Sequence, residues 1–221
     1  MRDEIAEAAG ACGREADSVR LVAVTKGHPV GAAQAARALG IRDLGENRVM
    51  ELEAKVGVVG REGLRWHMIG HLQSRKAPTA LAVADLIHSV DSVRLAERLD
   101  RSAEQSRSRA DVLVQVNTSG EDAKSGLAAS EAVSAILTIA ALPRITVHGL
   151  MTMAPFIDDE GVLRGAFGRL RETLDAVRAH DAGVGPELSM GMSNDLRWAV
   201  EEGSTMVRIG TALFGPRPGF D

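Results

Sequence analysis

Short apolar runs alternate with longer segments of helical period along the whole chain. The runs are rich in Val, Ile and Leu, and between them apolar residues recur at the three- and four-residue spacing of an amphipathic helix. Short continuous apolar runs predict strands of a parallel sheet, because such strands are covered on both faces. Eight strands are predicted in this way, over residues 19–26, 41–45, 65–70, 86–91, 111–117, 145–151, 187–192 and 205–210.

Helices are predicted between these strands, and one more opens the chain. They cover residues 2–12, 30–39, 47–58, 74–84, 92–108, 129–141, 160–180 and 194–202. A strand–helix unit that recurs about every 27 residues predicts an α/β fold, a single (β/α)8 TIM barrel with an additional N-terminal helix. One domain over residues 1–221 is expected, since no Pro-, Ser- or Gly-rich linker divides the chain. A doubly wound open sheet is the alternative.

Polar and small residues follow the predicted strands, at the ends where barrel proteins of this kind carry their sites. We therefore expect the chemistry of the chain at these strand ends. The residues there are Lys26, Glu46, Asn47, Gly70, His71, Asp91, Asn117, Met151, Thr152, Met192, Ser193, Arg208, Gly210 and Thr211.

Lys26 ends the first predicted strand. The two-residue period of a strand places Val22, Val24 and Lys26 on one face, which either lines the barrel or packs on helices. If this face lines the barrel, the ammonium lies above an apolar floor, where desolvation lowers its pKa and frees the amine as a nucleophile for carbonyl compounds. The alternative is a strand-end lysine that reaches into water.

The other three lysines of the chain have plainer settings. Lys55 follows Glu51 by four residues, which predicts an ion pair on a helix surface. Lys76 lies near a predicted helix start. Lys124 lies in a loop whose order, Lys-Ser-Gly, is not that of a Walker phosphate loop.

Two glycine-containing segments, residues 189–195 and 208–211, predict an anion site made by two loops. Glycines allow a close backbone approach, the hydroxyls of Ser193 and Thr211 donate hydrogen bonds, and a following helix start adds N–H groups. The alternative is that Ser193 serves only as the N-cap of the helix predicted over 194–202, with the glycines in turns.

Arg208 shares a strand face with Met206 and Gly210, so its guanidinium is expected inside a largely apolar barrel. Buried arginine is rare unless it is paired or holds a ligand. The alternative is a structural ion pair with an inward acid. The six histidines predict no metal site, because His67 and His71 are four residues apart on a strand pattern rather than a helix. We expect His67 in the core or at the rim of the barrel.

Composition excludes several classes of protein. The 221 residues are 45% hydrophobic, and 26 Lys and Arg stand against 30 Asp and Glu, so no basic surface predicts nucleic acid or an anionic membrane as a partner. The longest uncharged apolar stretch, residues 134–143, is too short to span a membrane. A lone cysteine, Cys12, forms no internal disulfide, which favours the cytoplasm. The polar outer faces of most predicted helices favour a monomer.

The motifs themselves then show a resemblance. The segments LVAVTK, GENRVMEL, WHMIGHLQSRK, VLVQVNTSGEDAKSG, GLMTMAP and LSMGMSNDLRWAVEEGSTMVRIGTALFGPR resemble, in order and spacing, the pyridoxal phosphate homeostasis protein family. The resemblance covers almost the whole chain, and motifs this long and numerous are highly specific.

The resemblance implies a barrel similar to the N-terminal domain of alanine racemase, fold type III of the enzymes that use pyridoxal 5'-phosphate (PLP). It implies that PLP is held as a Schiff base on the lysine that ends the first strand. The residues implied as PLP-binding are Lys26 for the Schiff base, Ser193, Gly210 and Thr211 for the phosphate, Arg208 facing the pyridine nitrogen, Asn47 lining the pocket, Met151 near the ring and His67 at the rim.

The composition then bears on mechanism. Racemisation on this architecture uses the lysine on one face of the substrate carbon and a tyrosine on the other, and the chain contains no tyrosine. An arginine that faces the pyridine nitrogen keeps that nitrogen unprotonated, which makes PLP a poor electron sink. We therefore expect a carrier or regulator of PLP rather than an enzyme, with delivery to PLP-dependent apoenzymes as a further expectation.

Two alternatives remain. One is a weak amino-acid racemase or transaminase-like enzyme in which Lys26 works alone or with His67 or a cysteine as the second base. The other is a barrel that binds a different phosphate compound without covalent chemistry.

Overall fold

Parallel strands form a closed barrel in this computed structural model, which describes residues 1–121 and 125–217. Strand β1 pairs with both β2 and β9, and β4 pairs with β5, so the eight barrel strands have no free edge. The predicted barrel is therefore confirmed and the open sheet is wrong. The barrel strands are β1 Arg20–Val24, β2 Asp43–Glu46, β3 Arg65–Met68, β4 Leu86–Val90, β5 Ala110–Asn117, β7 Ile145–Met151, β8 Glu187–Ser189 and β9 Met206–Ile209.

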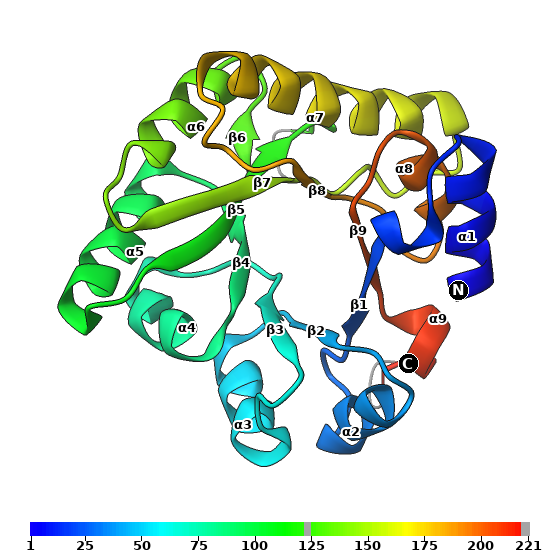
Figure 1. Cartoon of the computed structure of the whole chain (residues 1–221), viewed down its shortest axis with the longest axis horizontal. Helices are drawn as coiled ribbons and strands as arrows, with labels where there is room; N and C mark the ends of the chain where they lie inside the picture. The colour runs from blue at the N-terminus through cyan, green and yellow to red at the C-terminus, as the bar shows by residue number, and fades with distance from the viewer. Residues whose placement is uncertain (122–124, 218–221) are drawn as a thin grey trace.

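Helices surround this barrel, and one of them lies in each connection between consecutive barrel strands (Figure 1). Their order along the chain matches the predicted alternation of strands and helices. The helices are α1 Arg2–Ala11, α2 Val30–Ala38, α3 Val49–Val59, α4 Ala77–Val83, α5 Val93–Ser106, α6 Ala132–Ala140, α7 Glu160–His180, α8 Leu196–Glu201 and α9 Thr211–Phe214, with 3-10 turns over Ala16–Ser18 and Ser74–Lys76.

The structure differs from the predicted boundaries at several element ends. The helix predicted over 74–84 begins with the 3-10 turn and becomes α-helical at Ala77, with a proline in its first turn. Three short elements of the described residues were not predicted: the 3-10 turn Ala16–Ser18, α9, and the two-residue strand β6 Leu127–Ala128, which pairs with the end of β5. Elements this short show no measurable periodicity, so the hydrophobic pattern could not reveal them.

The main core lies between the outer face of the barrel and the helices. Helix α5 illustrates it, because Leu95, Leu99 and Ala103 recur every fourth residue and are fully or almost fully buried. Its N-cap, Ser92, accepts a hydrogen bond from the Leu95 N–H at 3.3 Å. Each fully buried leucine of this layer stabilises the fold by about 1.5–3 kcal/mol.

The interior of the barrel is more polar than the outer core. One small apolar cluster, Val22, Leu86, Leu113, Met151 and Met206, fills its middle. In barrels of this type bulky branched residues dominate the interior layers. Here buried histidines, a serine, a glutamine and an arginine lie beside the apolar cluster: His67, His88, Gln115, Ser189 and Arg208.

Helix α1 covers the seam of the barrel, where the first strand, β1, pairs with the last strand, β9. Its residues Ile5, Ala8 and Ala9 form an apolar cluster with residues of α8 and β9. Arg14 adds two hydrogen bonds across the seam, to the carbonyl oxygens of Val200 at 2.9 Å and Ser204 at 2.8 Å. Figure 1 shows α1 (blue) lying beside α8 (orange) at this position.

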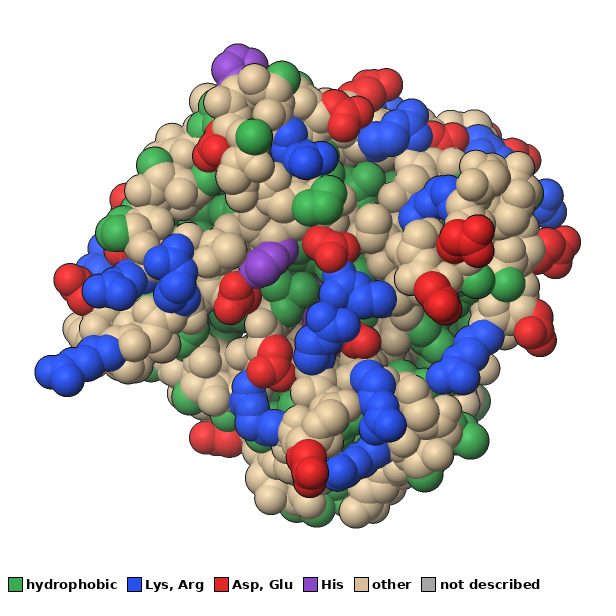
Figure 2. Space-filling view, viewed as in Figure 1, with side chains coloured by type: hydrophobic (Ala, Val, Ile, Leu, Met, Phe, Trp, Pro, Cys, Tyr) green, Lys and Arg blue, Asp and Glu red, His purple; other side chains and the backbone are tan. Residues whose placement is uncertain are grey.

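The surface carries charges of both signs. Cationic and acidic side chains lie side by side over the centre of the face shown in Figure 2. No helix within residues 1–121 and 125–217 is both long and apolar enough to cross a membrane.

Candidate functional site

A cavity of about 1110 Å³ opens at the carboxyl ends of the barrel strands. Its size lies at or above the upper end of the usual range for small-molecule pockets. Six of the eight residues predicted for the site line it: Lys26, Asn47, Ser193, Arg208, Gly210 and Thr211. The structure therefore brings together residues from both ends of the chain.

Lys26 lies half-buried in this cavity, directly after β1. The predicted strand face is confirmed, because Val22 belongs to the apolar cluster inside the barrel and Val24 lines the cavity with Lys26. Burial lowers the pKa of the Lys26 ammonium, the charges of Arg217 and Arg208 lower it further, and Glu46 opposes them. A larger fraction of Lys26 is therefore the neutral, nucleophilic amine than for a lysine in water.

The turn after Lys26 is held by side chains of α3. Gly27 adopts φ +72°, a left-handed conformation that favours glycine, and its N–H donates to Glu51 Oε1 at 2.7 Å. Lys55 Nζ donates to the carbonyl oxygen of Thr25 at 2.7 Å. The residues on both sides of Lys26 are thus fixed by hydrogen bonds to one helix.

The surface setting expected for Lys55 is wrong. Its predicted pair with Glu51 exists, at 2.9 Å, but Lys55 is only 5% exposed and also donates to Glu46 Oε1 at 2.6 Å. The reason is that the face of α3 that carries Lys55 packs on the ends of β1 and β2. The ion pair is therefore covered by the backbone and side chains of those strand ends. Lys124, by contrast, lies outside the described residues.

Glu46 is the fully buried acid beside Lys55. Its Oε1 also accepts a hydrogen bond from the Thr25 hydroxyl, whereas its Oε2 has no hydrogen-bond partner among the described residues. Burial raises the pKa of the Glu46 carboxyl, and its hydrogen bonds to Lys55 and Thr25 oppose that rise. We call Thr25, Glu46, Glu51 and Lys55 the ionic cluster.

Asn47 follows β2 and reaches the cavity because Gly70 leaves room for its backbone. A Cβ at Gly70 would lie 2.4 Å from the carbonyl oxygen of Asn47, closer than real Cβ contacts come. Gly70 therefore permits the end of β3 and the segment after β2 to lie against each other. This close approach of the two segments brings Asn47 and Gly70 together in one part of the cavity wall.

Ser193, Gly210 and Thr211 line the cavity in the segments that follow β8 and β9, which are the two predicted loops. The N-cap role considered for Ser193 is wrong, because α8 begins at Leu196 with Asp195 as its N-cap. The Asp195 carboxylate accepts a hydrogen bond from the Met192 N–H at 2.5 Å. The hydroxyls of Ser193 and Thr211 make no hydrogen bond to other described residues, so both are available as donors to a ligand.

Arg208 enters the barrel as predicted and is 5% exposed. The predicted alternative, an ion pair with an inward acid, is wrong within the described residues. Its hydrogen bonds go to neutral groups: Nη1 donates to Ser189 O and Oγ, both at 2.8 Å, and Nη2 donates to Thr152 O at 2.9 Å. Burial lowers the pKa of Arg208 to about 10, while Asp195 opposes the shift. The guanidinium is still charged at neutral pH.

His67 and Met151 do not line the cavity. Met151 belongs to the apolar cluster inside the barrel. The rim position expected for His67 is not what the structure shows, because its side chain is 1% exposed and points into the barrel. There Nε2 lies 3.0 Å from Asp43 Oδ1, and Nδ1 lies 2.8 Å from Nε2 of His88.

Several residues of the site were missed by the sequence analysis. Arg217 lines the cavity and comes within 3.0 Å of the position of a Cβ on Gly27, but the motif around it carries no local signal. The alternation Leu86-Ile87-His88 does place His88 on the inward face with Leu86, and this signal could have identified it. Lys55 could not be identified, because helical spacing alone does not show which face is buried.

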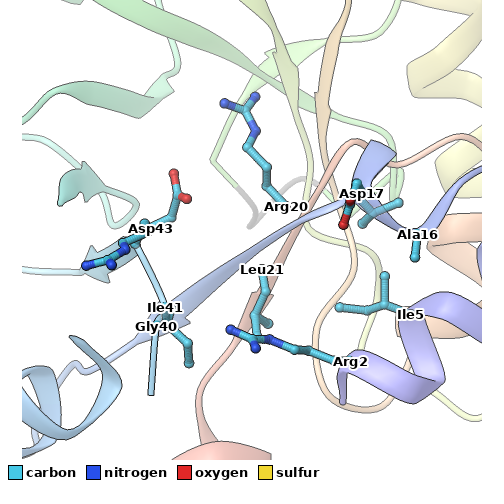
Figure 3. Close-up of a pocket in the computed structure, with 11 residues that line it drawn as sticks. Arg2, Ile5, Ala16, Asp17, Arg20, Leu21, Gly40, Ile41 and Asp43 are labelled. Atoms are coloured by element: carbon cyan, nitrogen blue, oxygen red, sulfur yellow. The ribbon is translucent and has the colours of Figure 1, made fainter. Parts of the chain in front are cut away.

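A second cavity, of about 450 Å³, lies at the opposite end of the barrel. Figure 3 shows Arg2 and Ile5 of α1, Arg20 and Leu21 of β1, and Asp43 of β2 around it. It is smaller than the cavity at the carboxyl ends of the strands, and no lysine is among the described residues that line it. The described residues contain no group of three or more His, Cys, Asp or Glu side chains placed to hold a metal ion.

The chain is similar to characterised families along nearly its whole length. It matches the alanine racemase N-terminal domain family over residues 2–218. It is 40% identical over 214 residues to the pyridoxal phosphate homeostasis protein of Pseudomonas aeruginosa, which covers 96% of this chain and 91% of the relative. The Escherichia coli protein of the same name is 38% identical over 220 residues, covering 98% of this chain and 94% of the relative.

Solved structures agree with these relatives. PipY of Synechococcus elongatus, in a structure with PLP bound, is 37% identical with a TM-score of 0.84 and covers 96% of this chain and 100% of that chain. An alanine racemase of Clostridium difficile is 16% identical with a TM-score of 0.76, covers 100% of this chain and 58% of that chain, and shares the fold alone. By its relatives and its fold, this chain belongs to the family of pyridoxal phosphate homeostasis proteins.

Proposed function

We propose that the chain binds PLP in the larger cavity, with the Lys26 amine in a Schiff-base linkage to the aldehyde of PLP. The observation that carries the proposal is the amine itself. Lys26 is half-buried, its pKa is lowered, and it has no hydrogen bond or ion pair to another described residue. Its Nζ can add to an aldehyde carbon, and one water leaves as the C=N bond forms.

The remaining donors of the cavity fit the rest of PLP. Ser193, Gly210 and Thr211 offer two uncommitted hydroxyls and a glycine backbone for the phosphate. Arg208 commits three N–H groups to protein oxygens, which leaves its Nε–H and one Nη2–H for a ring nitrogen. Asn47 forms part of the cavity wall. Met151 and His67 lie inside the barrel, beneath the cavity. Bound PLP supplies a reactive aldehyde and an aromatic ring that can accept electrons.

We propose a role in PLP homeostasis without strong catalysis. An enzyme of the racemase type needs a second base across from Lys26, and the chain has no tyrosine. The other candidates for a second base are His67 and a cysteine. His67 is buried inside the barrel, Cys12 is exposed at the end of α1, and neither lines the cavity. The cavity residues therefore support holding PLP better than they support turnover of an amino acid.

We further propose that the protein acts in the cytoplasm as a monomer, limits the free aldehyde and delivers PLP to PLP-dependent apoenzymes. The lone cysteine supports the compartment, because reduced thiols are normal there. The polar outer helix faces support the monomer.

The test of PLP binding is chemical labelling. Purified protein is mixed with PLP, its visible spectrum is recorded, and borohydride reduction is followed by mass spectrometry of peptides. We expect one label, on Lys26, and its complete loss in Lys26→Ala. Lys76→Ala is the matched control, since Lys76 lies away from the cavity, and it should label like the wild type. A label elsewhere, or none, would make a barrel that binds another phosphate compound without covalent chemistry the better assignment.

The test of the absence of catalysis is proton exchange. Amino acids are added to the PLP-loaded protein in heavy water, and loss of the α-proton signal is followed by NMR. We expect exchange far slower than that of dedicated racemases. Rapid exchange that disappears in Lys26→Ala would establish the weak racemase instead.

A further inference from the structure

An unbroken chain of hydrogen bonds runs through the inside of the barrel from the larger cavity to the smaller one. It begins at Arg208, whose Nη1 donates to Ser189 Oγ at 2.8 Å. Ser189 Oγ lies 3.0 Å from His88 Nδ1, and His88 Nε2 lies 2.8 Å from His67 Nδ1. His67 Nε2 lies 3.0 Å from Oδ1 of Asp43, where the chain ends. We call Asp43, His67, His88 and Ser189 the interior chain.

The two ends determine the direction of every bond between them. An arginine guanidinium can only donate hydrogen bonds, and an ionised carboxylate can only accept them. Since Ser189 Oγ accepts from Arg208, its own proton is free for His88 Nδ1. His88 then donates from Nε2 to His67 Nδ1, and His67 donates from Nε2 to Asp43. Every member makes both of its bonds in this one arrangement.

The reverse arrangement is disfavoured by the same contacts. If His88 donated from Nδ1 to Ser189, His67 would have to donate from Nδ1 to His88. The Nε2 lone pair of His67 would then face the Asp43 carboxylate oxygen, unless an extra proton were added inside the barrel. Burial and the charges of His67, Arg208 and Arg20 lower the pKa of His88, which disfavours such added charge.

Besides Arg208 and its neighbour Asp195 at the first end, charged groups surround the chain at its Asp43 end. Asp43 also pairs with Arg65, at 3.1 Å, and lies near Arg20, which itself pairs with Glu187. Burial raises the pKa of the Asp43 carboxyl, but the hydrogen bond to His67 and the charges of Arg65 and Arg20 outweigh it and lower that pKa overall. Asp43 therefore stays an acceptor at neutral pH. Figure 3 shows Asp43 and Arg20 at the second cavity, so the chain spans the barrel.

We propose that the interior chain positions Arg208. It holds one edge of the guanidinium in a single orientation, so that the remaining donors face the cavity. Resting on the proposed function, this means that the chain determines how Arg208 meets the ring nitrogen of bound PLP. His88 and His67 are positioning residues that touch no ligand, which assigns a role to two buried polar side chains that the binding site does not use directly.

The first experiment needs no PLP. In protein labelled with 15N-histidine, the imidazole nitrogen shifts distinguish protonated nitrogens from acceptors. We expect His67 and His88 each to show one tautomer, with the proton on Nε2. Mixed tautomers, or a proton on Nδ1 of either ring, would overturn the proposal. This result is independent of whether PLP binds, so it separates failure of the interior chain from failure of the proposed function.

The second experiment compares variants. His88→Leu and Asp43→Leu break the chain, whereas Asp43→Asn keeps an amide oxygen that can accept from His67. Leu113→Ala is the control for a damaged barrel interior, because Leu113 belongs to the apolar cluster and not to the chain. The readouts are the Arg208 Nε resonance, the absorption maximum of the protein with PLP, and the dissociation constant for PLP.

We expect the two chain-breaking variants to shift the Arg208 resonance and the absorption maximum, and to bind PLP about tenfold more weakly or worse. Leu113→Ala should leave both spectra as in the wild type, and Asp43→Asn should shift them less than Asp43→Leu, because its amide oxygen can still accept from His67. If Asp43→Asn changed the spectra as much as Asp43→Leu, the charge of Asp43 and not its ability to accept a hydrogen bond from His67 would determine the spectra. The proposal would then fail. If His88→Leu does not fold, the comparison of Asp43→Leu with Asp43→Asn and the measured tautomers of His67 and His88 still test the proposal.

Discussion

Two polar groups lie against the larger cavity, one beside Lys26 and one beneath Arg208, and they are built from different interactions. The ionic cluster beside Lys26 contains three charged groups at close range and leaves one carboxylate oxygen, Glu46 Oε2, without a described partner. The interior chain beneath Arg208 has neutral middle members, each of which makes two hydrogen bonds.

The difference shows what each support is suited to do. A buried ion pair is sensitive to the loss of either partner, because the other charge then remains buried without compensation. It also changes the pKa of a neighbouring amine, as Glu46 does for Lys26. A neutral, fully paired chain has little effect on charge but restricts orientation. The ionic cluster therefore adjusts reactivity, and the interior chain adjusts geometry.

The largest expected effect comes from removing the cation of the ionic cluster. Lys55→Met leaves Glu46 as an unpaired buried carboxylate, so the free energy of unfolding should fall by about 3–5 kcal/mol. Urea denaturation at neutral pH measures it. Adding Glu46→Gln removes the stranded charge and should restore a large part of the loss. If the double variant were no more stable than Lys55→Met, the loss would come from packing and not from charge.

A smaller effect is expected from breaking the interior chain. His88→Leu removes two hydrogen bonds but leaves no charge uncompensated, so the free energy of unfolding should fall by about 1–3 kcal/mol. The same urea titration measures the loss, with Leu113→Ala alongside it as the interior control. A loss as large as that of Lys55→Met would contradict the contrast drawn between the two supports.

The ionic cluster should also differ from the chain in its effect on pH dependence. The negative charge of Glu46 raises the pKa of Lys26, so Glu46→Gln should lower that pKa and increase the neutral amine at a given pH. The rate of borohydride-trapped labelling by PLP, measured against pH, should then reach its midpoint at lower pH than in the wild type. His88→Leu should leave the midpoint in place. A midpoint that moved upward in Glu46→Gln would contradict the assignment.

The smallest effect is expected at a histidine–aspartate pair that belongs to neither support. His148 Nε2 lies 2.6 Å from Asp111 Oδ1, as close as the buried pairs, but both side chains are more than 40% exposed. His148→Leu should change the free energy of unfolding by about 0–1 kcal/mol and leave PLP binding unchanged. An effect comparable to that of His88→Leu would show that burial is not what separates these pairs.

The order and type of the main elements were predictable because the apolar runs have the length and composition of covered parallel strands. All eight predicted strands occur, although β8 ends at Ser189 and not at residue 192. The overextension has a physical cause. Met190 is fully buried after β8 ends, and its N–H still donates to the carbonyl oxygen of Met206 in β9 at 3.1 Å, so both the apolar pattern and the pairing continue past the regular strand.

The site was predictable where it depends on strand ends and less so where it depends on helix faces. Lys26 and Arg208 follow from the two-residue period of β1 and β9, which determines their direction. The burial of Lys55 depends on how α3 docks on the ends of two strands, which one helical sequence does not specify. His67 depends on its partners Asp43 and His88, which lie on neighbouring strands far from it in sequence.

The pairing of β1 with β9 has a consequence for when the cavity can form during synthesis of the chain. Val22 lies opposite Arg208 in this pairing, so the lysine near one end of the chain and the arginine near the other belong to adjacent strands. The two halves of the cavity therefore cannot meet until the ribosome has made every strand from β1 to β9. A nascent chain that stops before β9 would carry the amine without its guanidinium neighbour, so tight PLP capture would report that all the barrel strands have been made.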